Sequence, residues 1–343
     1  MLRDVTGRRS GEGKVPLPKG FAPQLATLVD AAPEGDEWLH ELKFDGYRIG
    51  CRIDGRTVSL ISRNGKDWTD HFPEVATAAR ELAVRRAFLD GEVAMLLPDG
   101  RTSFQALQNA SGTGDGQLAY FVFDLLHVDG RDVAALPLEQ RKARLADLLR
   151  TKPPRCFRYS EHVVGHGGEF FARACGMGLE GIVSKRRHLR YAAGRGPAWL
   201  KTKCIKRQEF VVGGFTDPEG SRLGIGALLI GVRDARGTLV FAGKVGTGFT
   251  NRSAQELRKR LDGIAQAECP FTPCPKGPLG RNAHWVKPTL VAEVAFTEWT
   301  SDGKIRHPSF QGLREDKPAR DIRREDPDPS RGTANGTGGA SSS

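Results

Sequence analysis

The sequence lacks the features that mark secreted and membrane proteins. Residues 1–19 contain no apolar core of the kind that a signal peptide needs. The longest apolar run lies near residues 226–232 and is far shorter than the ~20 residues of a membrane-spanning helix, so we interpret it as a strand. These absences predict a cytoplasmic protein with no membrane partner.

Cysteine is scarce and scattered. Of the six cysteines only Cys269 and Cys274 lie close together in the sequence. His284 follows nearby, but two cysteines and one histidine do not complete a tetrahedral metal site of recognised spacing. We therefore predict reduced, unpaired cysteines, as is usual in the cytoplasm.

Acidic residues are outnumbered by basic ones. The 343 residues include 41 Asp and Glu against 52 Lys and Arg, which gives a net charge of +11. Such an excess is typical of chains that contact polyphosphate or nucleic acid, although it does not identify the partner. The length is sufficient for about two domains.

Short alternating runs predict an α+β fold with antiparallel hairpins. An Asp-Gly pair at residues 54–55 joins two expected strands. Helical periodicity is present at residues 72–85, 138–149 and 169–177. This arrangement differs from the regular strand–helix alternation of a parallel sheet.

A second unit is expected from residue 207 to residue 320. Strands are predicted at residues 209–215, 226–232, 239–245 and 291–299, and a capping box at residues 253–256 opens a helix. Several strands with one inserted helix suit a small barrel of the OB type. Residues 1–20 and 321–343 are polar and rich in Gly, Pro or Ser, so we expect a flexible leader and a disordered tail.

Residues 41–48 (ELKFDGYR) place Lys43 at the end of an apolar run, just before an Asp-Gly turn. Glu41 is two residues away on the expected strand and so points to the same side. A lysine with a pKa near ~10.4 is almost wholly protonated at neutral pH. It becomes a nucleophile only where desolvation or nearby positive charge lowers that pKa. The motif alone is a weak signal.

Other charged residues have two interpretations each. Lys201 and Lys203 share a strand face, where they would repel each other unless an anion such as a phosphate lies between them. The alternative is that both lysines are solvated on an edge strand. Glu92 and Glu180 lie among apolar strand residues, where a carboxylate is unfavourable unless it binds a cation such as Mg²⁺ or accepts hydrogen bonds. Taken alone, a glutamate in such a position more often has a structural role.

Phosphate and base contacts are suggested by further residues. Arg48 and Arg63 are candidate phosphate forks, and Phe123 offers a flat surface for a base or packs in the core. Arg314 and Lys317 form a basic cluster near the C-terminus, which is either functional or a solvated face.

The order of these segments resembles that of the motifs of ATP-dependent DNA ligases, members of the covalent nucleotidyltransferase superfamily. The matching segments are residues 43–46, 62–65, 90–92, 123–124, 180–185, 199–203 and 314–317. Residues 21–26 and 306–314 are similar to the ligase module of bacterial ligase D, an end-joining ligase. The resemblance covers about residues 21–317.

The resemblance implies a nucleotidyltransferase (adenylation) domain over residues 21–206, followed by an OB-fold domain. It implies ATP and Mg²⁺ or Mn²⁺ as cofactors, and duplex DNA with nicks or ends as substrate. It also implies a monomer associated with the bacterial nucleoid, helped by a Ku-like end-binding protein. Lys43 would take AMP from ATP, and the AMP would pass to a 5′-phosphate before a 3′-hydroxyl displaces it.

The resemblance also assigns roles to individual residues. Phe123 would stack on the adenine, and Glu41 would contact the base or orient the lysine. Lys201 and Lys203 would hold the α-phosphate, whereas Lys185 is either another phosphate contact or structural.

The same resemblance divides the remaining residues between phosphates and metal. Arg48 and Arg63 would hold the ribose and the nick phosphates. The metal would be bound by Glu92 and Glu180. Arg314 and Lys317 would orient pyrophosphate after the OB domain closes.

Three alternatives remain open. An RNA ligase or an mRNA capping enzyme shares the lysine motif, and capping enzymes use GTP. A non-catalytic DNA-binding module with a ligase fold is the alternative from another class. An NAD-dependent ligase is disfavoured, because the sequence has no four-cysteine zinc finger.

Overall fold

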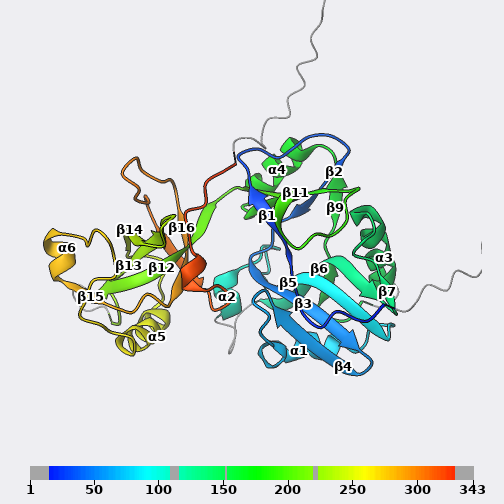
Figure 1. The fold of residues 1–343 in the computed structure, drawn as a ribbon, viewed down its shortest axis with the longest axis horizontal. Coiled ribbons are helices and arrows are strands. Elements are labelled where there is room, and N and C mark those ends of the chain that lie inside the picture. Colours follow the sequence, from blue (N-terminus) through cyan, green and yellow to red (C-terminus); the bar gives the residue numbers. More distant parts are fainter. Residues whose placement is uncertain (1–14, 109–115, 151–152, 219–222, 329–343) are drawn as a thin grey trace, which may run out of the picture.

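The computed structural model describes residues 15–108, 116–150, 153–218 and 223–328. The strands in these ranges form three sheets (Figure 1). Two sheets are built from strands between residues 24 and 203, and the third contains strands that follow residue 205. Among the described residues, no helix is both long and apolar enough to cross a membrane.

The first sheet has the strand order β1-β11-β10-β2-β9. Its strands are β1 (Gln24–Leu28), β2 (Trp38–Leu42), β9 (His162–Val164), β10 (Gly181–Arg186) and β11 (Gly194–Lys203). All its pairs are antiparallel except β1 with β11. The candidate nucleophile Lys43 directly follows β2 in the chain.

The second sheet has the order β4-β3-β5-β6-β7, with β8 paired to β6. Its strands are β3 (Gly46–Asp54), β4 (Thr57–Ser62), β5 (Arg86–Leu96), β6 (Gln117–Val128), β7 (Arg131–Asp132) and β8 (Phe157–Tyr159). The expected hairpin is present, because Asp54 pairs with Thr57 across a two-residue turn in which Gly55 has φ +63°.

The third sheet has the order β14-β13-β12-β16-β17, with β15 paired to β12. Its strands are β12 (Lys206–Thr216), β13 (Ala227–Arg233), β14 (Leu239–Val245), β15 (Ala283–Trp285), β16 (Val291–Phe296) and β17 (Ser309–Leu313). The four strands expected in the second unit are all present, within a few residues at each end.

Helices cover these sheets. They are α1 (Pro73–Ala79), α2 (Phe104–Gln108), α3 (Leu138–Arg150), α4 (Gly167–Gly176), α5 (Asn251–Asp262) and α6 (Gly277–Arg281), with short 3₁₀ turns η1 (Thr69–His71) and η2 (Ala319–Asp321). The start of α5 differs from the prediction. Thr250 is its N-cap and exchanges hydrogen bonds with Ser253, so the capping box lies three residues earlier than expected.

Part of the expected leader is packed against the body of the protein. The Val15 N–H donates to the Gly130 carbonyl (2.8 Å), and Leu17 is buried in a cluster with Phe21 and Phe88. Residues 1–14 lie outside the described ranges. Residues 15–20 are ordered, contrary to the prediction, because Leu17 and the adjacent Phe21 bury apolar surface. The polar composition of the segment hides this contribution.

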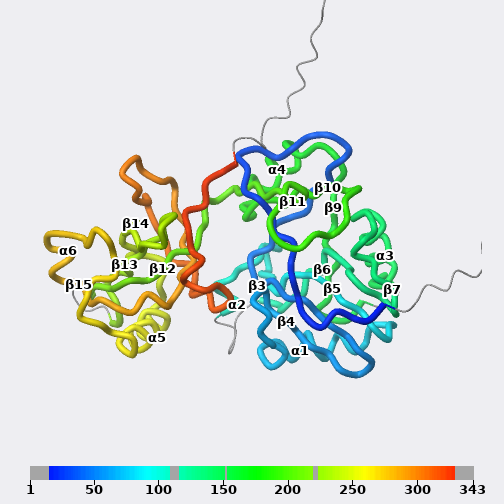
Figure 2. Tube along the Cα trace, viewed as in Figure 1, coloured from blue at the N-terminus to red at the C-terminus, as the bar shows by residue number. Residues whose placement is uncertain are grey.

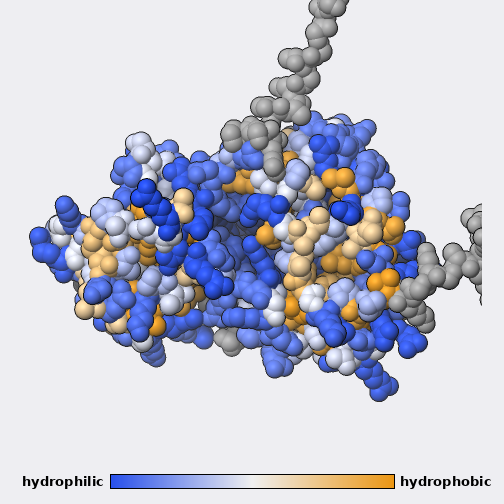
Figure 3. All heavy atoms as spheres, viewed as in Figure 1, coloured by the Kyte–Doolittle hydropathy of each residue, from blue (hydrophilic) through white to orange (hydrophobic). Residues whose placement is uncertain are grey.

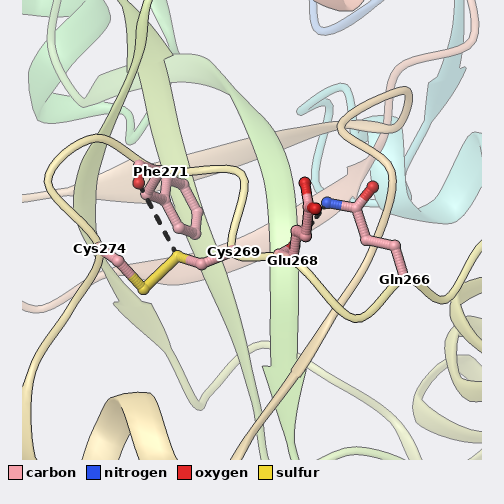
Figure 4. The surroundings of a disulfide bond; sticks show 5 residues. All are labelled: Gln266, Glu268, Cys269, Phe271 and Cys274. Atoms are coloured by element: carbon pink, nitrogen blue, oxygen red, sulfur yellow. Dashed lines mark hydrogen bonds between the residues drawn. A yellow bond between two sulfur atoms is a disulfide. The ribbon is translucent and has the colours of Figure 1, made fainter.

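The prediction of unpaired cysteines is wrong for four of the six. Cys175 at the end of α4 is disulfide-bonded to Cys204, in the turn between β11 and β12. Cys269 is bonded to Cys274 within one loop (Figure 4). Pairing of residues 175 and 204 depends on the fold, which brings two segments separated by 29 residues together. The free cysteines, Cys51 and Cys156, are buried.

The two halves of the molecule meet where α2 contacts β17. Gln108 donates one hydrogen bond to the Leu313 carbonyl and another to the Tyr47 hydroxyl (3.1 Å). Gly312 lies opposite with φ +155°, and a Cβ there would come within 2.1 Å of Gln108 and 2.9 Å of Phe104. Glycine at this position therefore permits the close approach that brings the third sheet toward Lys43.

Candidate active site

A cavity of about 650 Å³ lies between the first two sheets and the third. Its walls carry charged side chains from all three sheets, and Figure 3 shows a hydrophilic hollow between the two halves. All eleven residues that the sequence nominated line this cavity: Glu41, Lys43, Arg48, Arg63, Glu92, Phe123, Glu180, Lys201, Lys203, Arg314 and Lys317.

Lys43 is fixed by its backbone at the centre of this cavity. Its N–H donates to the Gly181 carbonyl (2.9 Å), which extends the pairing of β2 with β10 by one residue. Its Nζ lies 2.5 Å from Glu180 Oε1. The adjacent turn is held by Asp45, whose carboxylate accepts from the Phe104 N–H (3.0 Å) and from Arg207 (2.7 Å). The turn that follows Lys43 is thus tied to both halves of the molecule.

The pKa of Lys43 differs from what nucleophilic attack requires. Burial lowers it, but attraction to Glu180, reinforced by a hydrogen bond and by Glu92 and Asp45, raises the pKa above its ordinary value. The ammonium form is therefore favoured in this state. Deprotonation requires that the Glu180 carboxylate find another partner, and a divalent cation is such a partner.

Glu92 and Glu180 both face Lys43 and have unused oxygen atoms. Glu180 Oε2 is buried without a hydrogen-bond partner. The Glu92 carboxylate has no hydrogen bond or ion pair within the described residues, and burial raises its pKa to about 7 against the opposing influence of Lys43 and Arg48. These features fit a hard divalent cation that takes its other ligands from phosphate and water. The described ranges contain no group of three His, Cys, Asp or Glu able to hold a metal by itself.

Glu41 belongs to a buried ion cluster. Its carboxylate accepts from Lys142 Nζ (2.7 Å), Lys185 Nζ (2.8 Å) and the Ser160 hydroxyl (2.8 Å). Burial raises its pKa, but the two lysines more than compensate and lower it. With these partners Glu41 orients Lys185 rather than Lys43. Of the two roles considered for Lys185, the structural one is the role these contacts favour.

Phe123 lies among cations. The Arg48 guanidinium is 4.6 Å from the ring centroid, and Lys185 Nζ is 4.4 Å from it. Trp199 meets the same ring edge to face at 6.0 Å and also lies beneath Lys185 (4.2 Å). Burial lowers the pKa of Lys185 to about 8 despite its contact with Glu41. Phe123 therefore lines the cavity with two cations against its ring, and the Trp199 ring stands nearly perpendicular to it.

The two candidate phosphate forks differ in their availability. Arg48 is bound by both carboxylate oxygens of Asp90, each at 2.6 Å, and Tyr191 donates to the same carboxylate (2.7 Å). Its guanidinium is thus fixed in position and has limited capacity for another anion. Arg63 makes no hydrogen bond or ion pair within the described ranges, so its guanidinium is available to a ligand.

Lys201 and Lys203 point to one spot, as their alternation on β11 predicts. An anion lies between them, and it is the carboxylate of Glu325, at 2.7 Å from Lys201 Nζ and 2.8 Å from Lys203 Nζ. Burial and the neighbouring Lys203 lower the pKa of Lys201 to about 8. Attraction to both lysines, stronger than the effect of burial, lowers the pKa of Glu325.

Arg314 and Lys317 approach the cavity from the third sheet. Arg314 binds both oxygens of Asp316 (2.8 Å each) and one oxygen of Glu293 (2.9 Å). Its guanidinium lies 4.5 Å from the centroid of the Phe104 ring on α2, across the contact between the two halves. Lys317 is paired with Glu209. Both cations are therefore neutralised in this structure.

Several charged residues of this site were not identified from the sequence. Lys142 is one, although a signal was present: Leu138, Arg141, Lys142 and Leu145 follow the i, i+3, i+4, i+7 spacing of a buried helix face. Both cations on that face are buried, and Arg141 forms a bidentate pair with Asp124. Glu325 has no comparable local signal, because its partners are more than 120 residues away.

Comparison with known proteins relates this geometry to a family. The model described as "ATP dependent DNA ligase domain" matches residues 23–203, and the "ATP dependent DNA ligase C terminal region" matches residues 221–317. A solved structure of a mycobacterial DNA ligase D complexed with ATP and MES has a TM-score of 0.68 and 35% sequence identity, and the match covers 89% of this chain and 98% of that one. This similarity confirms the expected α+β fold with a nucleotidyltransferase and an OB-fold domain.

Bacterial proteins of the same family are also similar to this chain in sequence. The multifunctional non-homologous end joining protein LigD of Pseudomonas aeruginosa is 42% identical over 340 residues, which is 97% of this chain. The multifunctional non-homologous end joining DNA repair protein LigD of Mycobacterium tuberculosis (strain H37Rv) is 38% identical over 309 residues, or 89% of this chain. The chain spans 40% of the length of each. The expected resemblance is thus confirmed, and the chain belongs to the family of ATP-dependent DNA ligases.

Proposed function

We propose that this chain joins a 5′-phosphate to a 3′-hydroxyl in duplex DNA through an AMP carried on Lys43, and that it does so in non-homologous end joining. The observation that carries the proposal is the placement of Lys43 against Glu180 and near Glu92, in a cavity whose other walls present phosphate-binding cations. With DNA as its substrate, we expect it to act at the bacterial nucleoid, in the cytoplasm.

The first step is nucleophilic displacement at the α-phosphorus of ATP. Lys43 Nζ gives up a proton, forms the P–N bond, and the bond from that phosphorus to pyrophosphate breaks. Glu92 and Glu180 would hold the divalent cation, Mg²⁺ or Mn²⁺, which neutralises charge on the phosphates when bound. Glu180, if it held the cation, would no longer stabilise the Lys43 ammonium, so this side chain would link metal binding to loss of the lysine proton.

The remaining cavity residues hold and orient the substrates. Phe123 would stack on the adenine, and Lys201 and Lys203 would grip the α-phosphate. Arg63 is available for a phosphate of the nick. Arg48, fixed by Asp90, would position the ribose.

The later steps use the same centre. The AMP passes from Lys43 to the 5′-phosphate of the break, and the 3′-hydroxyl then attacks that phosphate as AMP leaves. Because Arg314 and Lys317 belong to the OB-fold domain, their contact with pyrophosphate requires the closed arrangement, and DNA binding requires that the domain move away.

A nick-sealing assay tests this proposal. The purified chain, given ATP and Mg²⁺, should seal a 5′-phosphorylated nick in duplex DNA, and the Lys43→Ala variant should not, because it lacks the nucleophile. Activity with GTP in place of ATP would indicate a capping-type enzyme. Sealing restricted to RNA would indicate an RNA ligase, and DNA binding without sealing by the unmodified chain would indicate a non-catalytic module.

The requirement for Mg²⁺ should depend on pH through Glu92. Its carboxyl has a pKa near 7, so it is ionised above that pH and neutral below it. The Mg²⁺ concentration giving half-maximal adenylation should therefore rise by up to about tenfold per pH unit below 7.

The Glu92→Gln variant is the control for this pH dependence. The two reactions differ only in Glu92, because all other titrating groups, including those of ATP, are the same in both. It should need more Mg²⁺ at pH 8 and show a smaller change between pH 8 and pH 6. An identical change in both proteins would contradict the role of Glu92.

Arg314 should matter for adenylation and not for phosphodiester formation. The Arg314→Met variant keeps an apolar contact with Phe104 but removes the charge, so lysyl-AMP formation should slow by about 100-fold. Sealing of a nick that already carries AMP should be nearly unchanged. The exposed Arg320→Met is a matched control. Equal losses in both steps would show that Arg314 has no special role in the first.

A Ku-like end-binding protein is the proposed partner, on the strength of the family and of the end-joining proteins it resembles. Two domains offer a small area for DNA, so a recruiting protein should increase joining of double-strand ends several-fold and leave nick sealing unchanged. Measurement of both reactions with and without purified Ku checks this, and equal end joining in the two conditions would contradict it.

A further inference from the structure

Residues 322–328, which we name the C-terminal strap, connect the two domains. This segment was expected to be part of a disordered tail, but it is hydrogen-bonded along its length. On the OB-fold side, the Arg233 N–H donates to the Ile322 carbonyl (2.8 Å). At the other end, the Asp328 N–H donates to the carbonyl of Leu28 on β1 (3.1 Å). Figure 2 shows this red segment passing from one domain to the other.

The middle of the strap is held by one side chain of the third sheet. Gln208 on β12 donates from Nε2 to the Arg323 carbonyl (3.0 Å) and accepts from the Glu325 N–H through Oε1 (3.1 Å). These two hydrogen bonds fix the backbone on both sides of residue 324. As a result the Glu325 side chain is directed into the cavity that contains Lys43.

Glu325 makes the same kind of contact that a bound phosphate would make. Its two oxygens are divided between Lys201 and Lys203, at 2.7 and 2.8 Å. The neighbouring Asp326 differs, because its carboxylate pairs with Arg324 (2.7 Å) and its side chain is 62% exposed. One of two adjacent acidic residues is therefore bound to the lysines, and the other lines the cavity as a largely exposed side chain paired with Arg324.

We propose that the C-terminal strap is an intramolecular competitor of the nucleotide, in which the Glu325 carboxylate occupies the site of the α-phosphate. This inference rests on the proposed function of Lys201 and Lys203. ATP must displace Glu325 before it can present its α-phosphate to Lys43. When the phosphate leaves with its product, the carboxylate returns and keeps the two lysines from repelling each other.

The physical basis is competition for one pair of cations. Lys201 and Lys203 cannot bind a phosphate oxygen and the Glu325 carboxylate in the same positions. Because the strap is tethered at both domains, its carboxylate competes at a high effective concentration that does not depend on dilution. The apparent affinity for ATP is reduced by the fraction of molecules in which the strap is displaced.

The strap also couples nucleotide binding to the relation between the domains. Its anchors lie on β13 and β12 of the OB-fold domain and on β1 of the nucleotidyltransferase domain. Displacement of Glu325 removes one of the contacts that hold these elements together. Binding of the nucleotide would therefore also weaken the contact that the strap makes between the two domains.

The Glu325→Gln variant tests the competition. It preserves the size of the side chain and the backbone hydrogen bond to Gln208 but removes the charge that the lysines bind. Asp326→Asn is the matched control, because it makes the same change in net charge one residue away. Calorimetric titration with an ATP analogue whose α–β linkage cannot be cleaved measures affinity without chemistry.

Glu325→Gln should bind the analogue at least about fivefold more tightly than the unmodified chain, and Asp326→Asn should bind it with unchanged affinity. Unchanged or weaker binding by Glu325→Gln would overturn the proposal. Thermal unfolding of each variant checks that the fold is intact. Because the titration involves no AMP transfer, failure of the ligase proposal would be seen separately, as absence of Lys43-dependent labelling from ATP.

A second measurement uses the unmodified chain and so does not depend on any variant folding. Addition of the analogue should accelerate hydrogen exchange at the backbone amides of Glu325 and Asp328, because displacement of the Glu325 carboxylate weakens the hydrogen bonds that these two amides donate. Unchanged or slower exchange at these amides would contradict displacement.

Discussion

The ion pair between Lys43 and Glu180 is the interaction on which the organisation of the cavity depends. It satisfies both charges in a site that is partly removed from water, and it keeps the lysine protonated. Under the proposed function, this pair would keep Lys43 unreactive until Glu180 takes another partner. Activation would then be an exchange of partners rather than the creation of new charge.

Other cations of the cavity are also paired with carboxylates of the protein. Lys201 and Lys203 are neutralised by Glu325, Arg314 by Asp316 and Glu293, and Lys317 by Glu209. Each of these pairs satisfies a cation that would otherwise be repelled by its neighbours. Arg63 is an exception within the described residues, and its free guanidinium is suited to a phosphate that arrives with the DNA rather than with ATP.

The sequence identified the cavity residues through short local motifs and through the order in which those motifs follow one another. Alternation on a strand places Lys201 beside Lys203, and the order of the motifs relates Lys43 to Glu180 across 137 positions that no periodicity connects. The partners of these residues were harder to predict. Glu325 reaches Lys201 from a segment whose composition indicates disorder, and Cys175 lies beside Cys204 because α4 packs on the first sheet. Contacts of this kind depend on the tertiary fold, which local composition does not encode.

Lys43 is the proposed covalent carrier of AMP, and peptide mapping tests this most directly. The chain is incubated with ATP and Mg²⁺, digested under conditions that preserve a phosphoramide bond, and examined by mass spectrometry for an AMP adduct. We predict a single adduct on Lys43 that disappears when pyrophosphate is added to reverse the reaction. An adduct on Lys185, Lys201 or Lys203 instead, with Lys43 unmodified, would contradict it.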